Sequence, residues 1–429
     1  MNAKNHFQNP KDPCQNHKLI MPRYSTKLEK PQGRDLECKD ASPGIKGSLD
    51  NYCVECHTQE NLMLCSQCNL FSFCKNKSCM ERRPDFISSC GHFLCKLITQ
   101  ELEEIRNEES TFYSTTENDI LLYGAPENPF LNSVGDFDMI DGARYYLSSL
   151  ESLYKLQAHV AHFTNSKRAW LASNETSMEL LRLCRKDKFG ARFMVPLQLL
   201  HLNRDDECYL FCKHWIMVAN YSSSDEFNDY REELHRNSKK GDFLFPGNEI
   251  IVDGMIYIDK NKKYPEQACR FNDIIEIFPR DRHPKSNWSQ ITCIVAICLI
   301  KMRIIAIAEA SKRLLSEFQS TDGGKAIEQV QTILEDFVVG PEMQKADIPK
   351  QKAMLFRLFD IIDSTNKSIL PAILNPEPLK QKKDPPTRPS EAYNTVVTSL
   401  ALFQSIDYGM NLLRQRYGDK PSYSLDLLR

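Results

Sequence analysis

The chain has 429 residues, of which 41% are hydrophobic and 26% charged, and its formal net charge is -2. This composition is typical of a globular chain with about two or three domains. The near-neutral charge gives no electrostatic footprint for nucleic acid or an anionic membrane, so we expect neither as a direct partner. Glycine is scarce, with 16 residues, which favours a helical scaffold over a glycine-hinged α/β enzyme.

Residues 1–49 are rich in Asn, Lys, Pro, Asp and Gly, with few aromatic residues and no sustained periodicity. Such a segment cannot bury enough apolar surface to offset the entropy cost of ordering it, so we expect a disordered arm. The opening residues, MNAKNHFQNPKDP, contain no apolar secretory segment. We therefore expect reduced cysteines and a location in the cytoplasm or the nucleus.

Half of the 16 cysteines lie in the short segment that follows, residues 50–97. Two Cys-x2-Cys pairs come first and further ligands follow: Cys53, Cys56, Cys65, Cys68, Cys74, Cys79, Cys90, His92 and Cys95. A Cys-x2-Cys pair closes a tight turn and directs two thiolates at one point, as a tetrahedral zinc site requires. A segment of about 45 residues also needs such a staple, because its core is too small to fold alone. The spacing predicts two zinc ions.

The order of these ligands resembles the MYND-type zinc finger, in which two Cys-x2-Cys pairs precede an aromatic-Cys, a further Cys, a His and a final Cys. The resemblance implies a small finger with two interleaved zinc sites. It assigns the first site to Cys53, Cys56, Cys74 and Cys79. It assigns the second site to Cys65, Cys68, His92 and Cys95.

The segment departs from the family pattern near its end. The gap before Cys79 is one residue longer than usual and the gap after His92 is one residue shorter. Cys90 is an extra thiol and an alternative to His92 as the seventh ligand. Met80 and Phe86 stand where the family has Gln and Trp, two side chains that shape its peptide groove.

Residues 98–140 are expected to form a linker that begins with a short helix over 98–107. A helical body is predicted from 141 to 319, because apolar residues there recur at helical spacing and four-residue polar turns separate the runs. The expected helices cover 141–163, 170–183, 191–202, 207–219 and 287–317. The long apolar run in the last of these is broken by Lys301 and Arg303, which indicates a buried core helix and not a membrane span.

The body shows a second resemblance. The run Leu180–Asp187 and the residues that follow it to Tyr209 are similar to TPR-like helical segments of uncharacterised, mostly fungal MYND-finger proteins, which also have a phrase like Leu370–Pro376. The resemblance implies a helical scaffold with no known reaction. The predicted class is therefore mainly α, a small two-zinc finger followed by a TPR-like helical body.

The rest of the chain is less regular. A hairpin is expected at 250–258, where Asp253-Gly254 separates two apolar runs. The segment 320–429 is predicted to contain C-terminal helices at 325–337, 350–364 and 391–417, with a proline-rich basic loop at 371–389.

These features favour an interaction scaffold and not an enzyme. The resemblance implies that the finger docks protein partners, typically proline-containing peptides, and the body would bind a second partner. One alternative is a RING-like ubiquitin ligase, since Cys90-Gly-His-x2-Cys95 imitates the centre of a RING, but no further cysteine follows before Cys184. The other is a MYND-linked protein methyltransferase, for which the sequence contains no SET-type cofactor run or glycine-rich loop. His159 and His162 lie three residues apart and are more typical of packing than of a metal site.

Overall fold

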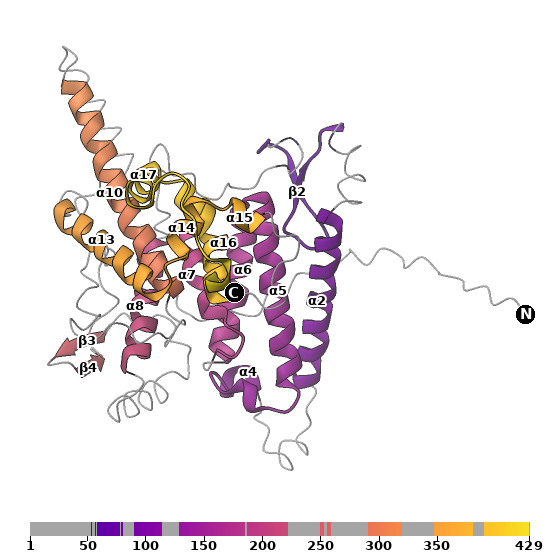
Figure 1. Cartoon of the computed structure of the whole chain (residues 1–429). Helices are drawn as coiled ribbons and strands as arrows, with labels where there is room; N and C mark the ends of the chain where they lie inside the picture. The colour runs from indigo at the N-terminus through magenta and orange to yellow at the C-terminus, as the bar shows by residue number, and fades with distance from the viewer. Residues whose placement is uncertain are drawn as a thin grey trace, which may run out of the picture.

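The computed structural model describes residues 53, 56, 58–77, 79, 90–113, 128–184, 187–221, 249–252, 255–258, 291–319, 347–380 and 390–428. This part of the chain is mostly helical, which confirms the predicted mainly α class (Figure 1). Its sheets are two antiparallel pairs, β1 with β2 and β3 with β4. The expected arm at 1–49 and the expected helix at 325–337 lie outside the described residues.

The cysteine-rich segment begins with a short hairpin. Strand β1, Leu62–Leu64, pairs with β2, Ser72–Cys74, so that Leu62 lies opposite Cys74 and Leu64 opposite Ser72. All three residues of β2 are buried, whereas Leu64 at the end of β1 is exposed. Because successive side chains of a strand point to opposite faces, β2 is covered on both faces, and β1 is the more exposed strand of the hairpin.

Helix α2, Cys90–Tyr113, corrects the expectation of a short helix at 98–107 within a linker. It is 24 residues long and begins inside the cysteine-rich segment. Ile98 and Ile105 are buried and Leu94 and Leu102 partly buried, so the helix has one continuous apolar stripe. No proline interrupts this stripe, so helix formation continues from the cysteine ligands to Tyr113.

The end of α2 is held by aromatic side chains. Phe112 packs edge-on against Phe137 with ring centroids 5.2 Å apart, and Phe130 stacks on Phe137 at 5.0 Å. Phe130 belongs to α4, Pro129–Asn132, and Phe137 begins a 3-10 turn, Phe137–Met139. These parts of the expected 98–140 linker are therefore folded against the helical body.

Three long helices lie side by side next to the cysteine-rich segment, as Figure 1 shows for α2, α5 and α6. Helix α5 is Ala143–Thr164 and α6 is Lys167–Leu183. Asn165, in the left-handed conformation with φ of 51°, ends α5, and the Ser166 hydroxyl accepts a hydrogen bond from the Ala169 amide to cap α6. This tight turn makes α5 and α6 an antiparallel pair.

Helix α10, Ile291–Gln319, forms the centre of the other half, packed against α7, Val195–His201, and α8, Asp205–Tyr221. Its segment Ile291–Ala310 is long and apolar enough to cross a membrane, but 83% of its most apolar stretch is buried inside the structure, as in a core helix. Arg303 is buried there and pairs with Asp205 at 2.6 Å.

The C-terminal helices are α13, Ile348–Thr365; α14, Ile369–Leu374; α15, Glu377–Lys380; α16, Glu391–Gln404; and α17, Asp407–Tyr417. Three of them, α13, α16 and α17, pack against α10, and α14 packs against these three (Figure 1). The expected single helix at 391–417 is two helices, because the chain breaks at Ser405 and Ile406. The expected loop at 371–389 begins instead with most of α14 and all of α15.

Two further 3-10 turns are Ala191–Phe193 before α7 and Leu425–Leu428 at the end of the described chain. Strands β3, Glu249–Val252, and β4, Met255–Ile258, form the antiparallel hairpin predicted at 250–258.

Candidate metal centre

The first cluster of thiols comprises Cys53, Cys56, Cys74 and Cys79, whose sulfur atoms all lie within 4.8 Å of one another. Cys53, Cys74 and Cys79 are buried and Cys56 is exposed. The Cys53 amide donates to the Thr58 carbonyl at 2.8 Å, which closes the turn that contains the first pair. Cys74 is the last residue of β2, so the hairpin delivers it to this cluster.

The second cluster comprises Cys65, Cys68 and Cys95, also within 4.8 Å of one another. The loop between the strands is closed by two hydrogen bonds, from the Cys65 amide to the Phe71 carbonyl at 2.7 Å and from the Asn69 amide to the Cys65 carbonyl at 2.9 Å. Asn69 has a φ of 55°, in the left-handed region that Asn tolerates well. Cys95 comes from the second turn of α2 and joins the two thiols of this loop.

The two clusters are interleaved along the chain. Cys65 and Cys68 lie in sequence between the two halves of the first cluster, because β1 leads into them and β2 leads out. The structure therefore brings together all four thiols that the resemblance assigns to the first site and three of the four ligands assigned to the second.

The sulfur–sulfur distances fit a tetrahedral metal. Cys56 Sγ lies 3.6 Å from Cys74 Sγ, and Cys65 Sγ lies 3.6 Å from Cys95 Sγ. A disulfide would need about 2.05 Å. Zinc–sulfur bonds of about 2.3 Å in a tetrahedron place sulfurs about 3.8 Å apart. Both thiol clusters could therefore hold a metal ion, and zinc is plausible.

The protonation of the second cluster is shared among its sulfurs. Hydrogen bonds from the Cys68 and Cys95 thiols lower the pKa of Cys65 to about 2. The hydrogen bond between Cys68 and Cys65 raises the pKa of Cys68 to about 11. In the first cluster, burial raises the pKa of Cys79 to about 12, and the neighbouring thiols add to this effect. A divalent cation would favour the thiolate form of these cysteines, because it offsets the repulsion between neighbouring negative sulfurs.

The side chains of Cys90 and His92, the two candidates for the seventh ligand, lie outside the described part of the structure. The backbones of Cys90 and His92 lie in the first turn of α2, ahead of Cys95. The structure therefore fixes the helix that carries both candidates.

The second cluster lies where the cysteine-rich segment packs against the helical body. Cys68 and Cys95 belong to one buried apolar cluster with Leu70, Phe71 and residues of α5 and α6. Cys53, Cys74 and Cys79 form a separate small cluster of their own. Metal at the second site would therefore affect the packing of the body, and metal at the first site would act on the finger alone.

A side chain from the body completes this contact. Arg168 in α6 donates from its Nε to the Asn69 carbonyl at 2.8 Å, across 99 residues of sequence. Sequence reasoning missed Arg168, because nothing in its local pattern distinguishes it from a surface arginine of a helix.

His159 and His162 lie at exposed positions near the end of α5. The His162 ring packs edge-on against Trp170 with centroids 4.6 Å apart, and His201 stacks on the same indole at 4.0 Å. His162 therefore packs on the Trp170 ring, and among the described residues it is not grouped with His159 in any metal-binding cluster.

Comparison of the chain with protein-family models, with curated proteins and with solved structures gave no match. The fold and the site alone define the class: a mainly helical protein with an N-terminal cysteine-rich unit, compatible with a zinc finger, whose two thiol clusters could hold metal ions.

Proposed function

We propose that the chain is a zinc-binding scaffold for protein–protein interactions, with a MYND-type finger that holds two zinc ions and a TPR-like helical body. The observation that carries the proposal is the interleaving of the thiol clusters around the β1–β2 hairpin. This is the ligand arrangement that the resemblance to MYND fingers implies.

The zinc ions would be structural. Four cysteine ligands fill the tetrahedron of the first site and leave no open position for an activated water. We assign the fourth ligand of the second site to His92, which lies three residues before Cys95 in α2, with Cys90 as the alternative. With both sites closed, the metals support folding and not turnover.

The partners would be protein segments. MYND fingers typically dock proline-containing peptides, and the hairpin here offers an exposed apolar residue, Leu64, which is 37% exposed. Antiparallel helical pairs such as α5 and α6 offer a second surface for another partner. The proposed location is the cytoplasm or the nucleus.

The test is binding of a proline-rich peptide array to the full-length, zinc-loaded chain. We expect Leu64→Asp to remove binding of the peptides that the finger recognises, because a charge would be placed on its apolar contact. Val397→Asp in α16 is the matched control, since Val397 is 44% exposed and lies on a C-terminal helix outside the cysteine-rich segment.

Peptide binding that survives Leu64→Asp, or that is lost equally in both variants, would contradict docking on the hairpin. Transfer of ubiquitin or of a methyl group to a captured partner by the purified chain would contradict the scaffold proposal.

A further inference from the structure

One thiol of the first cluster is open to solvent. Cys56 is exposed, whereas the other three members of the cluster, Cys53, Cys74 and Cys79, are buried. In the described part of the chain every other free cysteine is buried except Cys65, which is half-buried. A dissolved oxidant therefore reaches the sulfur of Cys56 more easily than that of any other described cysteine.

The state of the Cys56 sulfur matters as much as its exposure. Peroxides react with the thiolate form of a cysteine, and only where solvent can reach it. A cysteine that binds a metal ion is held as a thiolate. Cys56 combines both properties when the first site is loaded, because it is a candidate ligand and is exposed. The buried ligands of the same site share the thiolate form but lack the access.

A second sulfur lies beside Cys56. Its Sγ is 3.6 Å from the Sγ of Cys74, although 18 positions separate the two residues in sequence. The sulfurs of a disulfide are about 2.05 Å apart, so an approach of about 1.5 Å would join them. Cys74 is the last residue of β2. A bond between the two would therefore tie the first Cys-x2-Cys pair to the end of the hairpin.

We propose that Cys56 is a site of oxidative modification, where hydrogen peroxide converts Cys56 and Cys74 into a disulfide and the metal ion of the first site is released. The Cys56 thiolate attacks one peroxide oxygen and becomes a sulfenic acid, while the O–O bond breaks and hydroxide leaves. The Cys74 thiolate then attacks the Cys56 sulfur, the S–S bond forms, and the sulfenic oxygen leaves as a second hydroxide. Two protons from solvent convert both hydroxides to water, so two thiolates are oxidised and one peroxide is reduced.

The modification would open the first site alone. A structural zinc site needs four ligands, and the disulfide leaves only Cys53 and Cys79. The second site would keep its ion, because Cys68 and Cys95 are buried in the apolar cluster that includes residues of α5 and α6. The inference rests on the two zinc sites of the proposed function and adds an oxidised state of the finger.

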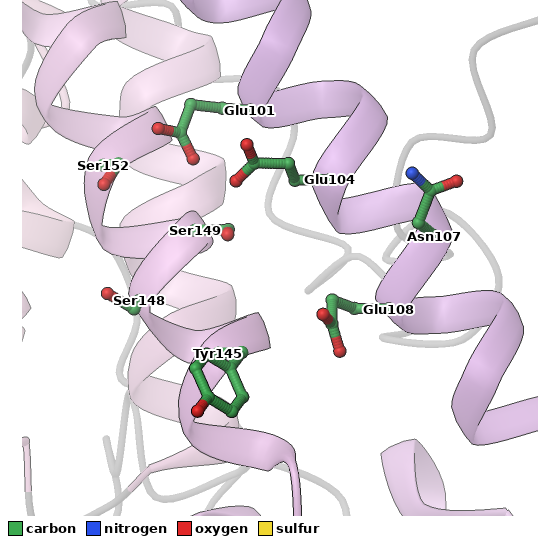
Figure 2. A pocket seen from close by; sticks show the side chains of 8 residues that line it. All are labelled: Glu101, Glu104, Asn107, Glu108, Tyr145, Ser148, Ser149 and Ser152. Carbon is green, nitrogen blue, oxygen red and sulfur yellow. The ribbon is translucent and has the colours of Figure 1, made fainter.

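The groove between α2 and α5 supplies an internal reference. Figure 2 shows the side chains that line it, from Glu101 of α2 to Ser152 of α5, and none of them is a cysteine or a methionine. Peroxide therefore meets no thiol or thioether there. Amide exchange at 101–108 should be the same before and after oxidation.

The experiment treats the full-length, zinc-loaded chain with hydrogen peroxide. A chromogenic chelator measures the zinc released, peptide mapping after alkylation of free thiols locates disulfides, and hydrogen–deuterium exchange follows the backbone. The test variant is Cys56→Ser. The matched control is Cys79→Ser, which removes a buried ligand from the same site but keeps Cys56 and Cys74.

We expect the wild type to lose one of its two zinc ions and to form the Cys56–Cys74 disulfide, both reversed by dithiothreitol and added zinc. Exchange should become faster at 62–74 and stay unchanged at 101–108. Cys79→Ser should still form the disulfide, because the pair is intact. Cys56→Ser should form no disulfide among the three remaining thiols of the cluster and should release no zinc, because its exposed thiol is gone.

Release of both zinc ions together, or a disulfide between Cys65 and Cys95, would show that exposure does not select the site and would overturn the proposal. A disulfide of Cys56 with a thiol other than Cys74, or wild-type oxidation of the cluster in Cys56→Ser, would also overturn it. A wild type that holds fewer than two zinc ions before oxidation contradicts the proposed function instead. The peptide map then decides this inference alone: the Cys56–Cys74 disulfide supports it and its absence overturns it.

Discussion

Replacing Cys68 with Ser is expected to loosen the helical body, whereas replacing Cys56 with Ser is expected to act on the finger alone. Both substitutions remove one thiol from a cluster of candidate ligands and keep nearly the same side-chain volume. Cys68 belongs to the large apolar cluster that includes α2, α5 and α6, but the first site forms a separate cluster without them. Both variants lose a candidate metal ligand, but only Cys68 packs against the body, so a difference between the variants reports on packing.

The magnitude follows from what the second site holds in place. Leu70, Phe71 and Phe73 are 6%, 1% and 4% exposed and pack against the body from the finger. Burial of each such side chain contributes about 1.5–3 kcal/mol, and the entropy of the released chain offsets much of the sum. We expect a net loss of about 2 kcal/mol in the free energy that keeps the N-terminal half of α2 packed, or about thirtyfold in amide protection.

Hydrogen–deuterium exchange on the full-length chain measures this effect peptide by peptide. For Cys68→Ser, faster exchange is expected at 94–105 in α2 and at the start of α6, where Arg168 contacts the finger. For Cys56→Ser, faster exchange is expected only in the finger itself. Equal exchange in α2 for the two variants, or unchanged α2 protection in Cys68→Ser, would refute the coupling.

Three further predictions concern single contacts. Arg168→Ala, which removes the hydrogen bond to the finger carbonyl at 2.8 Å, should cost about 1.5–3 kcal/mol of finger docking, measured by exchange in α2. Asp205→Ala should cost about 3–5 kcal/mol in urea unfolding, because it leaves Arg303 buried and unpaired; a loss under 1 kcal/mol, about the value of an exposed pair, would show that the pair is solvated. Burial raises the pKa of Glu391 from 4.5 to about 7, so its contribution to stability is present below pH 4.5 and is lost as the pH rises through 7. Glu391→Gln should therefore melt at a higher temperature than the wild type at about pH 8 and show no gain at pH 4.5, and a gain at both pH values would contradict the titration.

The candidate site was largely predictable from the sequence, because ligand spacing is a local property. Two Cys-x2-Cys pairs and the later cysteines were enough to propose the two groups that the structure brings within 4.8 Å. The contact of Arg168 with Asn69 was not predictable, since it joins residues 99 positions apart and depends on how α6 packs.

The helices show the same division between local and long-range information. Periodic runs predicted α5, α6 and α10 within a few residues. The length of α2 was missed, because its apolar stripe is completed by a finger residue, Cys95, that was assigned only to metal. The break between α16 and α17 was missed as well, because no proline or glycine marks it. After the turn Ile406 and Met410 are buried, and Gly409 of α17 lies against Met302 of α10.

The most direct test of the account is the zinc content of the reduced, folded, full-length chain, measured by elemental analysis. Two closed clusters predict two zinc ions per chain in the wild type and one in each of Cys56→Ser and Cys68→Ser. His92→Ala should also hold one ion, and Cys90→Ser two, if His92 is the seventh ligand. A wild-type chain that holds one zinc ion, or none, would contradict the two-site account.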